Sequence, residues 1–276
     1  TIHKTYDSTQ KLSVSTQRFA QVLGDVRTVA PAREYGLILW SHSNGWAETK
    51  SGNISNISNR QPKNFGDDYG ASMPIDSLSM AIPDNMFNFI WTDACYMGSI
   101  EIAYELRNDT KYFIGSPTEI LSYGMPYDQN IPCFFENTAD LKSACQNMFN
   151  FYDRLQGEYR SATISLIDCS KLNEIANLCL ETNIKNKQIS TSDLLCYNSS
   201  SNRFYFDFLQ TYSKIATGEQ FAKLQQALNQ AVIYKAATPK ILNTITIKPE
   251  AFSGLSTYVM GSANSRNEKA YKALKW

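Results

Sequence analysis

The chain of 276 residues is poor in the residue types that build metal clusters and disulfide frameworks. It has only two histidines, His3 and His42, so a histidine-rich metal cluster is excluded. Its six cysteines form no CxxC pair, which argues against a zinc site and against a dense set of disulfides. A reaction that needs an imidazole base therefore has almost no choice of residue.

Excess charge and long apolar runs are missing as well. The 26 basic and 26 acidic residues balance, so neither a nucleic-acid partner nor an anionic membrane is indicated. No apolar run approaches the length of a membrane span. The chain opens at Thr1 without a secretion signal, so we expect a processed chain whose signal or anchor segment is not part of it.

What the chain does have is a buried strand that ends at reactive side chains. The apolar run 87–91 predicts this strand, and Asp93 and Cys95 follow it directly. Helical spacing begins at 99–107, so Cys95 lies on a strand-to-helix turn. Backbone N–H groups and the helix dipole at such a turn favour thiolate over thiol. A buried structural cysteine is the alternative interpretation.

A second buried strand leads to a histidine in the same way. The apolar run 35–41 predicts the strand, and His42 follows at its carboxyl end. A lone histidine is often only a structural residue of a core or a turn. Because the carboxyl ends of strands form the crevice of an open α/β sheet, a base and a nucleophile at two such ends favour a catalytic pair.

The rest of the pattern alternates strands with helices. Further strands are expected at 111–116, 162–168, 231–234 and 254–260, and helices at 15–29, 74–82, 129–136, 138–156, 171–184, 206–215, 218–230 and 265–274. The polar stretches 46–70 and 186–203 are expected to be loops or insertions. Such alternation predicts an α/β fold with a mainly parallel sheet and helices on both faces.

A cysteine and a histidine are the smallest set of side chains that performs acyl transfer. The imidazole takes the thiol proton and later protonates the leaving amine. The backbone N–H groups of Ser43 and Cys95 are candidates to bind the oxyanion. Period-two geometry puts Asp93 on the same side as Cys95. Asp93 could orient His42, pair with a basic substrate side chain, or only satisfy nearby N–H groups.

These residues resemble the clostripain family of cysteine peptidases, which shares the caspase-like fold with the caspases and gingipains. The resemblance rests on His42–Trp46 after one strand and Asp93–Met97 after a later one. It continues through 101–107, 115–119, 124–127 and 252–258. It implies one caspase-like peptidase domain over residues 1–276, with a catalytic dyad of His42 and Cys95.

The resemblance also implies a function, a substrate preference and a location. The expected enzyme is a cysteine endopeptidase that cleaves after Arg, and more weakly after Lys, through a thioester acyl-enzyme. Its partners would be peptides or proteins, and it would be secreted or attached to a bacterial cell envelope. The sequence requires no cofactor and predicts no metal site, and calcium enters by the resemblance alone. The residues expected to bind substrate are Asp93, Glu119, Tyr123 and Met125.

Self-cleavage during maturation is a further implication. The polar loop 46–70 holds three basic residues at which it is expected, namely Lys50, Arg60 and Lys63.

Three departures from the family pattern leave alternatives open. Ser43 stands where the family usually has glycine, and its side chain could crowd the oxyanion site. No second acid aligns in the loop 123–127, although Glu119 and Asp128 are near. By the resemblance, family members begin with a strand-helix unit that this chain lacks, and we expect that it was either removed or exists as a separate piece. A catalytically weak family member that binds peptides is therefore one alternative, and a thiol acyltransferase is another.

Overall fold

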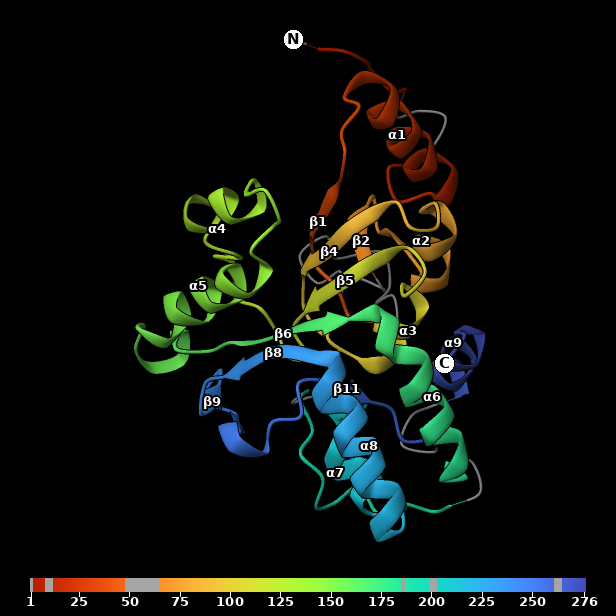
Figure 1. Ribbon diagram of the computed structural model, residues 1–276, viewed down its shortest axis with the longest axis vertical. Coiled ribbons are helices and arrows are strands. Elements are labelled where there is room, and N and C mark those ends of the chain that lie inside the picture. The colour runs from red at the N-terminus through yellow and green to blue at the C-terminus, as the bar shows by residue number, and fades with distance from the viewer. Residues whose placement is uncertain (1, 8–11, 48–64, 185–186, 199–202, 261–264) are drawn as a thin grey trace.

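The computed structural model describes residues 2–7, 12–47, 65–184, 187–198, 203–260 and 265–276. A five-stranded sheet in the order β1-β4-β5-β6-β8 runs through its centre (Figure 1). Its strands are β1 (Gly36–Trp40), β4 (Phe87–Asp93), β5 (Thr110–Gly115), β6 (Thr163–Asp168) and β8 (Val232–Ala237). β1, β4 and β5 pair in parallel, and only β6 runs against its two neighbours. The expected mixed α/β fold with a mainly parallel sheet is confirmed.

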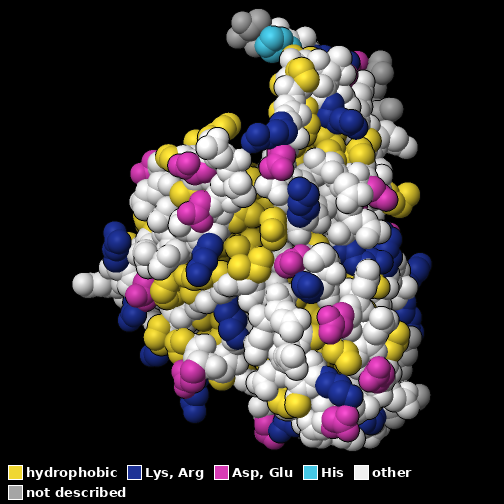
Figure 2. All heavy atoms as spheres, viewed as in Figure 1, with side chains coloured by type: hydrophobic (Ala, Val, Ile, Leu, Met, Phe, Trp, Pro, Cys, Tyr) yellow, Lys and Arg dark blue, Asp and Glu magenta, His cyan; other side chains and the backbone are white. Residues whose placement is uncertain are grey.

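Helices cover both faces of this sheet (Figure 1). They are α1 (Thr16–Val29), α2 (Ile75–Ala81), α3 (Ile100–Glu105), α4 (Tyr127–Phe134), α5 (Leu141–Asp153), α6 (Leu172–Glu181), α7 (Phe208–Ser213), α8 (Gly218–Ala231) and α9 (Ser265–Ala273). Within the described residues, no helix combines the length and the apolar character that crossing a membrane requires. Figure 2 shows acidic and basic side chains interspersed over the face in view, in keeping with a balanced charge.

Two hydrophobic cores lie on opposite faces of the sheet, because side chains alternate along a strand. The register partners Ile90 and Phe113 belong to the core under α1, α2, α3, α6 and α8. The partners Trp91 and Ile114 belong to the core under α4 and α5. The central strands are therefore buried on both faces, as their continuous apolar runs predict.

Capping side chains fix the starts of two helices at the predicted places. The Ser15 hydroxyl accepts the N–H of Arg18 at 3.3 Å at the start of α1. The Ser99 hydroxyl accepts the N–H of Ile102 at 3.3 Å at the start of α3. These caps satisfy N–H groups that have no partner within the helix.

The stretch expected to be a loop as far as Gly70 ends instead in a hairpin. Its strands are β2 (Phe65–Asp68) and β3 (Ala71–Met73), which pair antiparallel. Tyr69 and Gly70 form the turn with φ angles of 52° and 79°. Left-handed backbone at both positions is what a two-residue hairpin turn requires. The polar composition of β2 hid this strand, because aspartate is depleted in strands.

The strand expected over 254–260 is much shorter than its apolar pattern predicts. Only β11 (Ser256–Thr257) forms, and it pairs with β7 (Phe206–Asp207). The N–H of Tyr258 donates to the Glu101 carboxylate at 2.7 Å. This N–H is therefore not available for the hydrogen bond that would extend the pairing of β11. The helix expected over 206–215 likewise begins only after β7. The remaining short strands, β9 (Lys240–Ile241) and β10 (Ile245–Thr246), pair with each other.

Candidate active site

The ends of β1 and β4 lie side by side because the two strands pair in parallel (Figure 1). Trp40 and Asp93 are the last register partners of this pair. His42 and Cys95 each follow their partner by two residues, so both leave the sheet at the same level. The topology thus brings the candidate base and nucleophile to one edge of the sheet, while their roles in catalysis stay predictions.

The turn that contains Cys95, residues 94–98, is called the cysteine turn. Backbone hydrogen bonds from the chain after β5 hold it. The N–H of Ile120 donates to the Cys95 sulfur at 3.3 Å, and the thiol faces the Ile120 carbonyl oxygen at 3.6 Å. The N–H of Tyr96 donates to the Thr118 oxygen at 3.0 Å. Gly98 must be glycine, because a Cβ there would lie 2.5 Å from the Pro117 nitrogen. The position of the sulfur is therefore set mainly by main-chain atoms.

The environment of the cysteine does not favour the thiolate, contrary to the expectation from the turn. Burial, with Glu119 and Asp93 nearby, raises the pKa of the Cys95 thiol to about 11, although the Ile120 N–H acts to lower it. Desolvation and neighbouring acids both disfavour the negative charge of a thiolate. The free thiol therefore needs a nearby cation or base before it can act as a nucleophile.

The turn that begins at His42, residues 42–47, is called the histidine turn, and it is built differently. The His42 side chain is exposed, whereas Ser43 is buried with its hydroxyl 3.1 Å from the Met97 sulfur. The Ser43 hydroxyl also accepts the N–H of Gly45 at 2.9 Å, so it is engaged inside the turn. The N–H of Gly66 donates to the His42 carbonyl oxygen at 3.2 Å. Among the described residues, no hydrogen bond joins the His42 imidazole to Cys95.

Asp93 is a buried carboxylate with one hydrogen-bonded oxygen and one oxygen without a hydrogen-bond partner among the described residues. Oδ2 accepts the N–H of Met125 at 2.9 Å and the hydroxyl of Tyr127 at 3.0 Å. Oδ1 is buried and has no hydrogen-bond partner in the described part of the chain. Burial raises the pKa of Asp93, although both hydrogen bonds act to lower it. A held carboxylate with a free oxygen is suited to accept a donor from outside the protein.

The other residues expected at the substrate lie along the segment that connects β5 to α4. Glu119 accepts the hydroxyl of Tyr96 at 2.5 Å. Tyr123 is 59% exposed, and its ring lies against Phe151. Met125 is only 1% exposed because its side chain packs in the core beneath α5. Its N–H, rather than its side chain, contacts Asp93, and a role of Met125 at the substrate stays a prediction.

Several residues that touch the candidate site were not singled out in the sequence. Ile120 binds the Cys95 sulfur through its backbone, which no side-chain pattern reveals. Tyr127 lay within the stretch 124–127 that resembles the family, but its bond to Asp93 was not expected. Gly124, with φ at +63°, packs so close that a Cβ would lie 2.7 Å from Asp93 Oδ2. Tyr205, far along the chain, contacts both turns and carried no signal.

Some expectations fall outside what the structure describes. Lys50, Arg60 and Lys63, the expected self-cleavage positions, lie in 48–64, outside the described residues. Within the residues that are described, no group of three or more His, Cys, Asp or Glu side chains could hold a metal ion.

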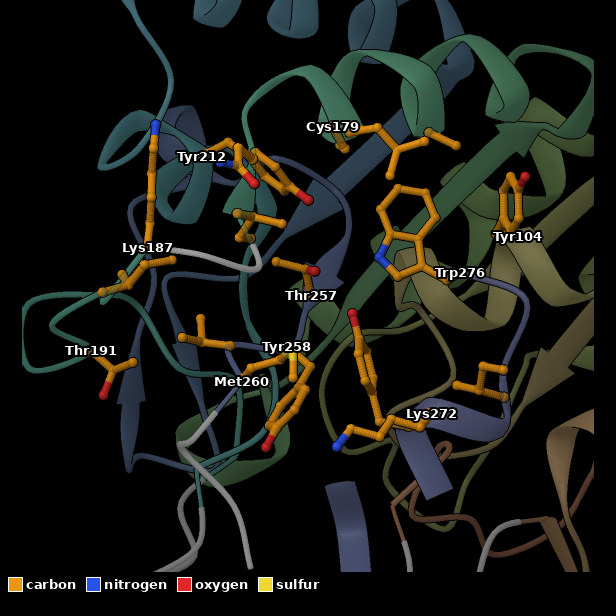
Figure 3. A pocket seen from close by; sticks show the side chains of 18 of the residues that line it. Tyr104, Cys179, Lys187, Thr191, Tyr212, Thr257, Tyr258, Met260, Lys272 and Trp276 are labelled. Carbon is orange, nitrogen blue, oxygen red and sulfur yellow. The ribbon is translucent and has the colours of Figure 1, made fainter. Parts of the chain in front are cut away.

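A separate hollow of about 1300 Å³ lies between α6, α9 and the chain after β11 (Figure 3). Aromatic side chains contribute much of its lining, namely Tyr104, Tyr212, Tyr258, Tyr271 and Trp276. Its described lining includes neither His42 nor Cys95. The hollow is therefore distinct from the candidate active site.

Comparison with known proteins gives a consistent result. The clostripain family matches residues 1–273, and no curated protein matches the chain. An inactive zymogen C11 protease from Parabacteroides distasonis has 32% identity and a TM-score of 0.80, with 99% of this chain and 77% of that chain covered.

Two structures from Bacteroides thetaiotaomicron are also similar. The secreted C11 cysteine protease "iotapain" has 26% identity and a TM-score of 0.81, covering 95% of this chain and 77% of that one. A secreted C11 cysteine protease bound to an irreversible peptide inhibitor has 29% identity and a TM-score of 0.77, covering 94% and 75%. These matches confirm the expected caspase-like fold. Because the family match spans nearly the whole sequence, the chain belongs to the clostripain family of cysteine proteases.

Proposed function

We propose that the chain is an endopeptidase in which Cys95 attacks the peptide carbonyl and His42 serves as base and acid. The observation that supports this most is the register of β1 and β4, because it places both residues two positions beyond a paired end. A nucleophile and a base at one sheet edge are what covalent acyl transfer requires.

The reaction follows from the atoms at this edge. His42 accepts the thiol proton while the sulfur bonds to the peptide carbon, and the N–H groups of Ser43 and Cys95 bind the oxyanion. The carbon–nitrogen bond then breaks as His42 returns the proton to the leaving amine. Water hydrolyses the thioester and restores the thiol. Because the pKa of the free Cys95 thiol is about 11, the imidazole is essential for its deprotonation.

We propose that Asp93 selects a basic residue before the cleaved bond, with Arg preferred over Lys. Its buried oxygen Oδ1 has no hydrogen-bond partner among the described residues and can accept a guanidinium hydrogen bond, and a buried cation needs such a partner. The planar fork of Arg matches a carboxylate better than the ammonium of Lys does. No second acid aligns in the loop 123–127, so we expect the pocket to tolerate some neutral residues.

The experiment that tests this function is digestion of a mixed peptide library with mass-spectrometric readout. Cleavage concentrated after Arg, then Lys, is the expected pattern. Cleavage concentrated after Met or Tyr would contradict the basic preference while leaving the peptidase function standing.

A catalytically weak, peptide-binding member is the second candidate. Two observations favour it, namely the raised pKa of Cys95 and the lack of a hydrogen bond between the described Cys95 and His42 side chains. A peptide-like thiol reagent separates the two candidates. Selective labelling of Cys95 that is lost in His42→Ala supports the enzyme. Peptide binding without labelling supports the binding protein.

We further propose that the reaction needs no cofactor, because thiol, imidazole and backbone N–H groups suffice for it. Activity that is unchanged in a chelator supports this, and activity restored only by calcium would show that the family resemblance extends to that ion.

We also propose that the protein acts outside the cytoplasm, secreted or attached to a bacterial envelope, as two similar structures are described as secreted. Cell fractionation of the producing organism tests this.

Self-cleavage after Lys50, Arg60 or Lys63 is proposed as well. These three residues would match the basic preference assigned to Asp93. Terminal sequencing of active enzyme should show a new start at Ser51, Gln61 or Asn64. An enzyme that stays uncut at full activity would contradict this proposal.

A further inference from the structure

A buried tyrosine from a distant part of the chain reaches the histidine turn. Tyr205 is 2% exposed, and its hydroxyl donates to the carbonyl oxygen of Asn44, 161 residues earlier in the chain. The same hydroxyl accepts the N–H of Ala47 at 3.3 Å. These two backbone groups belong to the turn that begins at His42. One hydroxyl therefore holds two points of this turn.

The ring of the same tyrosine lies on the cysteine turn. It stacks on the ring of Tyr96 with centroids 5.2 Å apart and planes 9° apart. Tyr96 directly follows Cys95 and has a left-handed φ of 59°, which a non-glycine residue keeps only when its surroundings hold it. Its hydroxyl donates to Glu119. Tyr205 therefore contacts both turns at once.

Tyr205, the histidine turn and the cysteine turn pack against one another without spare room. Gly45 lies between them with φ at +63°. A Cβ at Gly45 would lie 2.5 Å from the Tyr205 hydroxyl oxygen and 2.6 Å from the Tyr96 carbonyl oxygen. A displacement of Tyr205 is therefore transmitted to the histidine turn rather than absorbed by empty space.

Tyr205 is itself firmly anchored. The N–H of Tyr197 donates to its carbonyl oxygen at 2.7 Å, and the residues that follow form β7, which pairs with β11. Burial raises the pKa of the Tyr205 phenol, so it remains a hydrogen-bond donor in neutral solution. The tyrosine thus has a fixed position and a fixed protonation state.

We propose that Tyr205 is a positioning residue that holds His42 at the place from which it can exchange a proton with Cys95. The inference rests on the proposed chemistry of Cys95 and His42. Because the described side chains of these two residues are not hydrogen-bonded to each other, the backbone turn decides where the imidazole lies. Tyr205 joins this turn to the cysteine turn through its hydroxyl and its ring, beside the contact of the Ser43 hydroxyl with the Met97 sulfur.

The test compares Tyr205→Phe with Tyr197→Phe in the full chain. Tyr197 is a matched control, because it is also buried and its hydroxyl donates to Asp207 at 2.6 Å, away from both turns. Tyr205→Phe keeps the stacked ring but removes the two bonds to the histidine turn. The readouts are kcat, KM, thermal stability and the pH profile of Cys95 alkylation by iodoacetamide.

We expect Tyr205→Phe to lower kcat by about tenfold to a hundredfold with KM nearly unchanged, since misplacement of a catalytic group costs rate rather than binding. Its alkylation profile should shift to higher pH, because a displaced imidazole no longer accepts the thiol proton. Tyr197→Phe should lose a similar amount of stability with neither effect. Equal kcat losses in the two variants, or an unshifted profile, would overturn the positioning role.

Two further variants complete the experiment. Should Tyr205→Phe fail to fold, Tyr96→Leu removes the ring on which Tyr205 rests and should give the same loss of kcat and the same shift in profile. An unchanged profile in Tyr96→Leu would also overturn the inference.

Cys95→Ala separates the positioning role of Tyr205 from the proposed chemistry. If it is inactive while Tyr205→Phe behaves like Tyr197→Phe, only the positioning role is wrong. If Cys95→Ala stays active, the proposed chemistry and this inference both fall.

Discussion

The cysteine turn and the histidine turn lie at the ends of neighbouring strands, yet different forces hold them. Main-chain groups of the adjacent segment 116–120 bind the cysteine turn. The histidine turn has one main-chain bond to β2, from the Gly66 N–H to the His42 carbonyl oxygen, and otherwise depends on side chains, chiefly the Tyr205 hydroxyl and the Met97 sulfur; its imidazole is exposed. A turn fixed by backbone tolerates side-chain substitution around it, whereas a turn fixed by side chains does not. We therefore expect the base to be the more easily disturbed partner.

Removal of the nucleophile has the largest expected effect. Cys95→Ala should lower kcat/KM by more than about a hundredfold, because no other group can form the thioester. Thermal unfolding should change little, since main-chain atoms hold this turn. Cys133→Ala is the control, because Cys133 is the other cysteine that is not fully buried. Near-normal cleavage by Cys95→Ala would end the assignment of the nucleophile.

Removal of the base comes next. His42→Ala should lower kcat by about a hundredfold or more, as expected when a general base is lost. Its fold should stay intact, because the side chain is exposed. His3→Ala, the only other histidine substitution available, should be silent. A His42→Ala enzyme with normal kcat would mean that the thiol is activated by another group and that the contrast between the turns has no bearing on catalysis.

Substitution of Asp93, the buried acid at the end of β4, should change specificity rather than chemistry. Asp93→Asn keeps a similar shape but loses the charge that pairs with a basic side chain. Wild type should favour Arg over Met by a few kcal/mol in matched substrates, and the variant should lose most of that difference. The ratios of kcat/KM for Arg, Lys, Met and Tyr substrates measure this. An equal loss for every substrate would instead assign Asp93 a structural role.

Much of this could be predicted from the sequence, because strands buried on both faces read as continuous apolar runs. Such runs located β4 and β1 and placed Cys95 and His42 at their ends. The contacts that surround the two residues could not be predicted. Ile120 acts through its backbone, and Tyr205 is brought in by folding from a distant segment. Met125 was assigned to the substrate although its side chain is buried, because a linear pattern does not show which face a loop residue turns inward.

Two glycines offer a finer test of the acid's placement. Gly124 and Gly157 have nearly the same left-handed φ, +63° and +61°. A Cβ at Gly124 would press against Asp93, whereas a Cβ at Gly157 would have no atom within 4 Å. Alanine at either position should cost about 1 to 2 kcal/mol of stability. Only Gly124→Ala should also reduce the preference for Arg. Equal specificity in the two variants would show that the close packing against Asp93 is not needed for selection.

The smallest expected effect is on the pH dependence of that preference. Burial raises the pKa of Asp93 above its ordinary value of 3.8, so the carboxylate takes up its proton at a higher pH than a free one. The ratio of Arg to Met cleavage should therefore fall on acidification with a midpoint above pH 3.8. The sign for stability is the opposite, because a carboxyl with a raised pKa makes the fold less stable as pH rises through its titration. A midpoint at or below the ordinary value would contradict the buried placement.

The shared register of β1 and β4 also makes the chain sensitive to insertions and deletions. Loss of the single residue Ser41 would draw His42 back by about 3.3 Å and turn its side chain to the opposite face. The sheet, the two cores and the family match would all survive such a change. A relative with both residues present but one residue more or fewer in either turn should therefore fold normally and fail to cleave peptides. The spacing from the paired strand ends is thus a better criterion for distinguishing active from inactive relatives than the presence of the two side chains.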